Sequence, residues 1–239
     1  DRTALRISVL AIGQQARSIR LEGIERSCKS EAEFLYNFEK ELTIALQRKR
    51  PDLFFVHGAA VVYDGRCTIL VGASGIGKST LCWGLCNEGF AYLSDELAPI
   101  NLRDMTVIPY PHALCIKKVP EGGYPLPKTA YSSEETMHIP FEAIPIPGPA
   151  SPAPLAGIVF LERQLQDGTA TGQRLGTAEA GARLYSHGLN QLAHALDGLP
   201  TVRRIAAAVP AWCLERSTPE AMREAIRNLV MRQPIVDNS

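Results

Sequence analysis

The stretch TILVGASGIGKST, residues 68–80, decides the fold of this chain. Residues 72–79 match the phosphate-binding loop pattern G-x-x-x-x-G-K-[ST] completely. An apolar strand leads into the loop, and a helix is predicted from Lys78 to about Asn87, closed by Gly89. A strand, a glycine-rich loop and a helix in this order predict an α/β fold with a phosphate-loop core.

Each position of the loop has a physical reason. The glycines let the backbone curl until successive N–H groups point inward at phosphate oxygens, and the helix N-terminus adds its dipole. Lys78 is predicted to reach the β- and γ-phosphates of a nucleotide, and the Ser79 hydroxyl is predicted to be a Mg²⁺ ligand. The residues predicted to bind the nucleotide are Ala73, Ser74, Gly75, Ile76, Gly77, Lys78, Ser79 and Thr80.

An acidic pair, Asp95 and Glu96, follows the predicted strand FAYLS, 17 residues after Lys78. Phosphoryl transfer needs carboxylates near the γ-phosphate, one to organise Mg²⁺ and one to accept the proton of the attacking hydroxyl. The short spacing lets this strand return beside the loop, which favours a functional pair. The alternative is that both residues merely cap a turn.

His57 lies in the apolar stretch LFFVHGAAVVY, before the loop strand. A single histidine in an apolar strand is usually a core residue whose hydrogen bonds are satisfied. If this strand lies next to the loop strand, His57 faces the γ-phosphate as a charge stabiliser or proton shuttle. The pattern alone leaves both interpretations open.

Outside the loop, the pattern predicts strand, turn and strand over 5–22, then a helix over 30–50 with a Ser30–Glu33 capping box. Asp64-Gly65 predicts a hairpin between strands 53–63 and 67–72, and residues 97–102 and 105–110 suggest a second hairpin. Further on, we expect a strand at 157–163, helices at 177–198 and 200–208, a strand at 211–216, and a last helix from Pro219 to about Arg232. Ser217 and Glu220 are placed as the capping box of that helix.

Residues 109–154 hold eleven of the seventeen prolines and cannot form a regular helix or ladder throughout. This stretch is either a substrate flap or an extended surface connection. We expect one domain over 1–239: an N-terminal strand-helix extension (1–50), a phosphate-loop core (51–118), a proline-rich loop (119–156), and a C-terminal strand and helical part (157–239).

Composition excludes several classes of protein. The chain has 239 residues with 25 basic and 25 acidic side chains, so it lacks the positive charge of a dedicated nucleic-acid binder. Apolar residues are 46% of the chain and no apolar run could span a bilayer, which indicates a globular protein without a membrane partner. The first residues do not form a convincing signal peptide, and none of the six cysteines is in a C-x-x-C pair, so we expect a cytoplasmic protein with free thiols.

The segments FVHGAAVV (55–62), GASGIGKST (72–80) and YLSDE (92–96) resemble the HPr kinase/phosphorylase superfamily. They look most like its smaller HPr-kinase-related members from bacterial biosynthetic clusters, including kinases of lasso-peptide precursors. The resemblance covers roughly residues 53–118, and VPAWCLER (209–216) with the helix after it is similar too. It implies a catalytic core related to that of phosphoenolpyruvate carboxykinase, with the phosphate loop embedded in a mixed sheet. It also implies His57 as the conserved histidine, Asp95 as the base toward a serine hydroxyl, and Glu96 with Ser79 at the metal.

The chain also departs from HPr kinases themselves. Thr80 stands where they carry Glu, Glu96 where they carry Asp, and PYPHALCIKK (109–118) replaces their L-G-I-R-x-I signature. HPr as the substrate and the reverse phosphorylase reaction are therefore not expected. The P-Y-P-x-x-L-C-x-K run resembles the related kinases instead, and it makes Lys117 a candidate contact to phosphate or substrate, with a plain surface lysine as the alternative.

The expected function is an ATP- and Mg²⁺-dependent kinase that phosphorylates a serine hydroxyl of a peptide or protein. By resemblance, the acceptor is a ribosomal precursor peptide of the lasso type. The alternatives are a kinase of free serine, a non-catalytic nucleotide-binding module, and a regulatory NTPase. The sequence leaves the acceptor, the base of the nucleotide and assembly into homo-oligomers open.

Overall fold

The computed structural model describes residues 7–12, 16–21, 24–117, 123–132, 136–162, 172–215 and 217–231. The chain divides into two compact units, Asp1–Pro51 and Asp52–Ser239. Each unit is described separately below, and the single domain expected from the sequence stays a prediction.

The first unit is an antiparallel sheet with one helix. Strands β1 (Ile7–Ile12), β2 (Ala16–Leu21) and β3 (Ile24–Cys28) pair in chain order, which confirms the predicted strand pair and adds β3, which the sequence analysis missed. Helix α1 (Glu31–Arg48) begins as predicted, because the Ser30 Oγ accepts a hydrogen bond of 3.1 Å from the Glu33 N–H. Phe34 of α1 packs against Ile19 and Cys28 to form the core of this unit.

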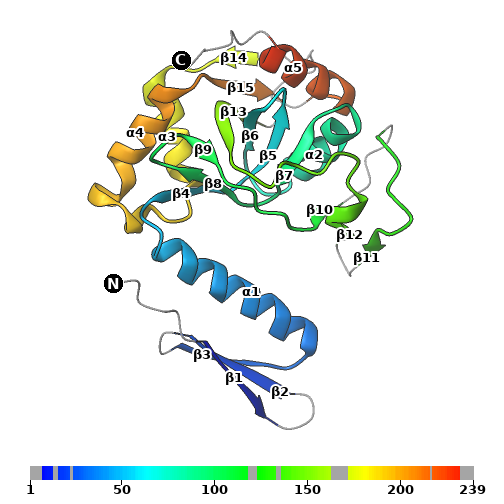
Figure 1. The fold of residues 1–239 in the computed structure, drawn as a ribbon, viewed down its shortest axis with the longest axis vertical. Coiled ribbons are helices and arrows are strands. Elements are labelled where there is room, and N and C mark those ends of the chain that lie inside the picture. The colour runs from blue at the N-terminus through cyan, green and yellow to red at the C-terminus, as the bar shows by residue number, and fades with distance from the viewer. Residues whose placement is uncertain are drawn as a thin grey trace. The chain divides into compact units, whose positions relative to one another are not determined.

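The second unit is built on a large mixed sheet with the order β4-β8-β9-β13-β6-β5-β7, to which β15 and β14 are added beside β13 (Figure 1). Strands β6, β13 and β15 are mutually parallel, and the other pairs are antiparallel. The strands are β4 (Leu53–Val56), β5 (Gly58–Tyr63), β6 (Arg66–Val71), β7 (Ala91–Ser94), β8 (Ala98–Asn101), β9 (Thr106–Val107), β13 (Ala153–Glu162), β14 (Gly172–Arg174) and β15 (Ala211–Glu215). The unit is thus a mixed α/β structure, as the sequence predicted.

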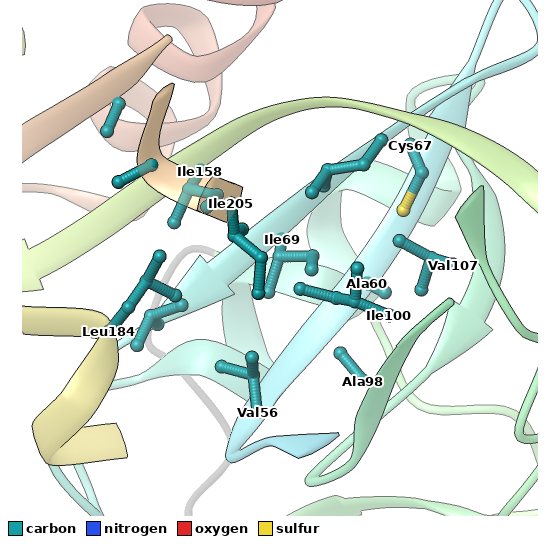
Figure 2. Packing of buried hydrophobic residues seen from close by; sticks show 14 of the residues in the cluster. Val56, Ala60, Cys67, Ile69, Ala98, Ile100, Val107, Ile158, Leu184 and Ile205 are labelled. Atoms are coloured by element: carbon teal, nitrogen blue, oxygen red, sulfur yellow. The ribbon is translucent and has the colours of Figure 1, made fainter. Parts of the chain in front are cut away.

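Helices cover both faces of this sheet (Figure 1). On one face, α3 (Thr177–His187) and α4 (Leu199–Ala208) bury Leu184 and Ile205 against Ile69 and Ile158 of the sheet (Figure 2). On the other face, α2 (Lys78–Asn87) and α5 (Pro219–Met231) pack their apolar residues against Leu70. Packing on both faces explains why every residue of β6 after Arg66 is buried.

Both predicted hairpins form. Asp64-Gly65 joins β5 to β6, and β8 pairs with β9. However, the predicted strand over 53–63 is wrong as a single element. It breaks at His57 into β4, which pairs with β8, and β5, which pairs with β6 and β7. The His57 N–H leaves the ladder and donates instead to the carbonyl of His187, at 2.8 Å.

The helix predicted over 177–198 is too long, because α3 ends at His187. The chain after it turns back along β4, where the Leu189 N–H donates to the carbonyl of Phe55. The buried Asn190 side chain accepts from the Phe55 N–H (3.0 Å) and donates to the Leu53 carbonyl (2.9 Å). These bonds satisfy backbone groups on the outer edge of β4. Residues 189 and 190 bind that edge and do not continue the helix, so α3 ends before them.

The proline-rich part of the chain is more regular than expected. Strands β10 (Leu114–Ile116), β12 (Met137–Ile139) and β11 (Tyr131–Ser132) form a small antiparallel sheet in that order. The buried Leu114, Ile116 and Ile139 of this sheet join the core beneath α2. A short 3-10 helix, η1 (Phe141–Ala143), follows.

The C-terminal elements keep their predicted order. Strand β13 begins four residues earlier than expected, at Ala153, and β14 beside β15 was missed. Helix α5 is capped by Thr218, not by Ser217, because the Ala221 N–H donates to the Thr218 Oγ1 at 3.3 Å. The predicted Ser217–Glu220 capping box is therefore one residue out of register.

Within the described ranges, no helix is long and apolar enough to cross a bilayer. All six cysteines lie in those ranges, and none of them forms a disulfide. The cytoplasmic location stays a prediction.

Gly148 is where the proline-rich part of the chain approaches the sheet most closely. A Cβ atom at this position would lie 2.0 Å from the carbonyl oxygen of Tyr92, a backbone atom that the Pro147–Tyr92 bridge holds in place. We expect Gly148→Ala to lower the free energy of unfolding by about 3 kcal/mol or more, since overpacking against backbone cannot relax through a side chain.

Chemical denaturation would measure this loss, and Gly181→Ala is the matched control. Gly181 lies inside α3, where a Cβ atom would have ordinary contacts at 3.9 Å. Alanine in a helix interior is expected to raise the free energy of unfolding by about 0.5–1 kcal/mol. Equal effects of the two variants would contradict the close approach at Gly148.

Candidate functional site

The candidate site lies at the edge of the large sheet where β6, β7 and β13 end and β5 begins. Strand β5 runs antiparallel to both β6 and β7, so those two strands run in the same direction and end at the same edge. The sheet therefore places the loop after Val71, the acidic pair after Ser94, and His57 before Gly58 next to one another.

The loop over 72–77 joins β6 to α2 as the sequence predicted. Gly75 and Gly77 have φ values of 79° and 110°, in the left-handed region that side chains with a Cβ atom avoid. Gly77 is the N-cap residue of α2, so no side chain covers the first N–H groups of this helix. Uncapped N–H groups and the positive end of the helix dipole together favour an anion here.

Lys78 is folded back onto the loop. Its Nζ donates to the carbonyls of Gly72 (2.7 Å) and Ala73 (3.2 Å) and lies 3.3 Å from the Nε2 of His57. Burial lowers the pKa of Lys78, while the nearby carboxylates of Asp95 and Glu96 raise it. The ammonium group is thus held in place before any ligand is present.

His57 links Lys78 to the acidic pair. Because an ammonium group can only donate, the His57 Nε2 accepts from Lys78, and its Nδ1–H donates to the carbonyl of Glu96 at 3.1 Å. This is the neutral form of the ring, and burial together with the charge of Lys78 lowers the pKa of His57 accordingly. His57 in this state positions its two neighbours and carries no charge of its own.

Asp95 is buried, with 2% of its surface exposed. Its Oδ1 accepts a hydrogen bond of 3.1 Å from the Ser79 hydroxyl, and its Oδ2 accepts one of 3.3 Å from the Cys115 N–H. Burial raises the pKa of Asp95 to about 6, against the lowering effect of the Ser79 hydrogen bond. A carboxyl group with such a pKa can both take and release a proton near neutral pH.

Glu96 is exposed and adopts a φ of 69°, which is uncommon for a residue with a side chain. It lines a cavity of about 510 Å³, together with the loop residues 74–80. Local strain of this kind often marks functional positions. The two acidic residues thus differ: Glu96 opens onto the cavity, and Asp95 lies behind Ser79.

Lys117 reaches the loop from β10, since its Nζ donates to the Ser74 Oγ at 3.3 Å. It lines the same cavity and contributes a second positive charge near Lys78. The location of Lys117 thus favours the predicted contact over a plain surface lysine.

Almost all of the predicted site residues converge on this cavity. The ones that line it are His57, Ser74, Gly75, Ile76, Gly77, Lys78, Ser79, Thr80, Glu96 and Lys117. Ala73 and Asp95 do not line it, although Asp95 reaches it through Ser79 and Ala73 binds Lys78 through its carbonyl.

The sequence analysis missed several residues of the site. The cavity is also lined by Leu81, Cys115, Thr136, Leu161, Ser217, Pro219 and Met222. His187, the last residue of α3, lies near Lys78 and His57. Burial lowers the pKa of His187, and these two neighbours lower it further. No spacing rule joins such distant segments to the loop. The sequence predicted the strand that carries Leu161, but only the structure shows that this strand, β13, pairs with β6 and so ends at the same edge.

Comparisons with known proteins add little to this geometry. No family model and no curated protein matches the chain. Among solved structures, the chain is similar to the Hpr(Ser) kinase/phosphatase from Coxiella burnetii, with a TM-score of 0.39 and 11% identity. The match covers 74% of this chain and 91% of that chain. A similarity of this size carries no argument about fold or function, so the resemblance to lasso-precursor kinases stays a prediction.

Proposed function

We propose that this chain is a kinase that transfers the γ-phosphoryl group of ATP to a serine hydroxyl of a peptide or protein. The observation that carries the proposal is the hydrogen bond between the phosphate-loop residue Ser79 and the buried carboxyl group of Asp95, 3.1 Å apart. It joins a group suited to proton transfer to a loop suited to phosphate, and Ser79 lines the cavity while Asp95 lies directly behind it.

Phosphate binding would use the groups that already face the cavity. The N–H groups at the start of α2 and the ammonium groups of Lys78 and Lys117 are all positive in sign. Lys78 would exchange its bonds to the Gly72 and Ala73 carbonyls for phosphate oxygens. His57 would hold Lys78 during this exchange, because its Nε2 accepts from the Nζ.

The donors at the cavity also fit Mg²⁺, which prefers oxygen ligands and commonly binds through one or two protein groups plus phosphates. Ser79 and Glu96 would hold the ion, since both line the cavity through a hydroxyl and a carboxylate. When bound, the ion would neutralise charge on the phosphate oxygens.

Asp95 would act as the general base. In the structure, Ser79 donates to its Oδ1, so the acceptor hydroxyl would use the second lone pair of that oxygen or replace Ser79 there before its proton passes to Asp95. The hydroxyl oxygen then bonds to the γ-phosphorus, the bond to the ADP oxygen breaks, and Asp95 holds the proton. A pKa of about 6 leaves Asp95 largely ionised at neutral pH and ready to accept it.

Only the sequence resemblance supports a particular acceptor, and it favours a serine of a lasso-type precursor peptide. Free serine is the close alternative. A nucleotide sensor would need no base, so the buried Asp95 beside the loop favours catalysis over a sensor. An NTPase could use the same carboxylate to activate water, so only the acceptor experiment separates it from a kinase.

The test follows ATP labelled at the γ-phosphate, with Mg²⁺, in three parallel reactions. One contains serine peptides, including peptides that end in serine, the second contains free serine, and the third contains no acceptor. We expect label on a peptide and little free phosphate without an acceptor. Label on free serine would move the proposal to a small-molecule kinase, and label found only as free phosphate would overturn the kinase.

A further inference from the structure

A cysteine and a histidine lie in contact beside the candidate cavity. Cys115 on β10 faces His138 on β12, and the two residues pair directly in the small sheet. The Cys115 Sγ is 3.1 Å from the His138 Nδ1, and the His138 Nε2 is 2.9 Å from the Thr136 Oγ1. The ring of Tyr131 stacks on His138, with centroids 4.9 Å apart and an angle of 8° between the planes.

The reaction proposed below uses the tautomer of His138 in which Nδ1 carries no proton. The Thr136 hydroxyl can accept from an Nε2–H, which leaves the Nδ1 lone pair directed at the thiol. The Cys115 Sγ contacts both this nitrogen and, at 3.5 Å, the Ala113 carbonyl, and of these two atoms only the nitrogen can take up the thiol proton. The stacked ring of Tyr131 disfavours rotation of the His138 ring out of this plane.

Cys115 is also the accessible thiol of the chain. The other five cysteines, all in described segments, are buried, whereas Cys115 is half-buried and lines the cavity with Thr136. A reagent that enters the cavity would therefore meet Cys115 first.

The charged groups around the pair have both signs. Lys78 and Lys117 line the same cavity wall and favour a thiolate, whereas Glu96 on that wall disfavours it. Asp95 accepts from the Cys115 N–H, and so places a second carboxyl group near the residue. Tyr92, whose pKa is raised by burial and more weakly by its neighbours, packs beneath and is neutral.

We propose that Cys115 and His138 form a modification site, at which a thiol with its own proton acceptor reacts with peroxide entering the cavity. The thiolate sulfur would attack one oxygen of hydrogen peroxide, forming an S–O bond while the O–O bond breaks. The departing hydroxide takes the proton from His138 and leaves as water. The sulfur is oxidised to a sulfenic acid and the peroxide is reduced, so atoms and electrons balance.

Oxidation of Cys115 would disturb Asp95, the candidate base. The Cys115 N–H holds the Oδ2 of Asp95, and the added oxygen would project into the cavity that Cys115 lines. This effect on activity rests on the proposed function, whereas the reactivity of the thiol does not.

The experiment measures the rate of Cys115 alkylation by iodoacetamide with peptide mass spectrometry, between pH 5.5 and 9. An ordinary thiol, with a pKa of about 8.5, is only about 1% thiolate at pH 6.5. We expect Cys115 to react about tenfold faster than N-acetylcysteine at pH 6.5, with little increase up to pH 8. Hydrogen peroxide followed by a sulfenic-acid probe should label Cys115 ahead of the other five cysteines.

Two histidine variants separate a specific pair from a general effect. His138→Gln should slow alkylation at pH 6.5 by about tenfold. His194→Gln should leave the rate unchanged, because His194 packs on Phe54 and does not line the cavity.

Two results would overturn the proposal. One is an alkylation rate that rises tenfold per pH unit up to about pH 8.5, as for an ordinary thiol. The other is an equal effect of the two histidine variants on that rate. The profile of the wild-type protein decides this even if a variant fails to fold. Adding ATP and Mg²⁺ separates the two proposals: a reactive Cys115 that the nucleotide does not protect would count against the nucleotide site alone.

Discussion

Asp95→Asn is expected to lower the rate of phosphoryl transfer by about 10²–10⁴-fold, the usual contribution of a general base. Asparagine keeps the shape of the side chain and can still accept from the Ser79 hydroxyl, but it cannot take a proton. Nucleotide affinity should change much less than the rate, because Asp95 does not itself line the cavity.

The same substitution should stabilise the fold at neutral pH. Burial raises the pKa of Asp95 from 3.8 to about 6, so between these values the folded state binds more protons than the unfolded state. The free energy of unfolding therefore falls as pH rises from about 4 to about 6, and the full penalty of roughly 3 kcal/mol is present above pH 6. Asparagine avoids this penalty but loses one hydrogen bond, worth about 1 kcal/mol.

Initial rates with labelled ATP and urea denaturation at pH 4 and pH 7 would measure both effects. We expect the stability of the variant relative to wild type to increase by about 2–3 kcal/mol between pH 4 and pH 7. Asp104→Asn is the matched control, since Asp104 is exposed and bonds only within its own turn, to Thr106.

Glu96→Gln tests the assignment of the base. Glu96 is the carboxylate that opens onto the cavity. Its loss should raise the Mg²⁺ concentration needed for half-maximal activity and change the rate at saturating Mg²⁺ much less. If Glu96→Gln abolished transfer while Asp95→Asn left it intact, Glu96 would be the base.

Lys78→Met is expected to weaken ATP binding by about 10- to 100-fold. A hydrogen bond to a charged group contributes about 1.5–3 kcal/mol, and Lys78 is the most buried cation beside the loop. Methionine matches the length of lysine but provides neither a charge nor a donor for phosphate. The variant should also release His57, whose Nε2 accepts from Lys78.

Isothermal titration with ATP and Mg²⁺ would give the dissociation constants, and circular dichroism would check the fold. The fold check matters because the Gly72 and Ala73 carbonyls lose their donor in this variant. Lys128→Met, at an exposed position, is the control and should bind as the wild type does. An unchanged dissociation constant for Lys78→Met would exclude the loop as the nucleotide site.

Local features of the sequence predicted the parts of the fold that depend on few residues. The Ser30 cap, the Asp64-Gly65 turn and the loop before α2 all formed as expected. The predictions failed where a distant segment competed for backbone hydrogen bonds. Strand 53–63 broke at His57 because its N–H found the His187 carbonyl, and helix 177–198 stopped because Asn190 and Leu189 bind β4.

The sequence by itself determined which residues are candidates for the site: the loop pattern over 72–79, its lysine and serine, and an acidic pair a short distance along the chain. The loop residues work through backbone geometry within one turn, so a contiguous pattern records them, and the acidic pair follows the next strand along the chain. The tertiary structure alone decided that His57 is neutral, that Asp95 lies buried behind Ser79, and that Cys115 meets His138. Protonation and reactivity depend on burial and on neighbours brought by strand pairing, and those neighbours come from segments that no single stretch of sequence contains.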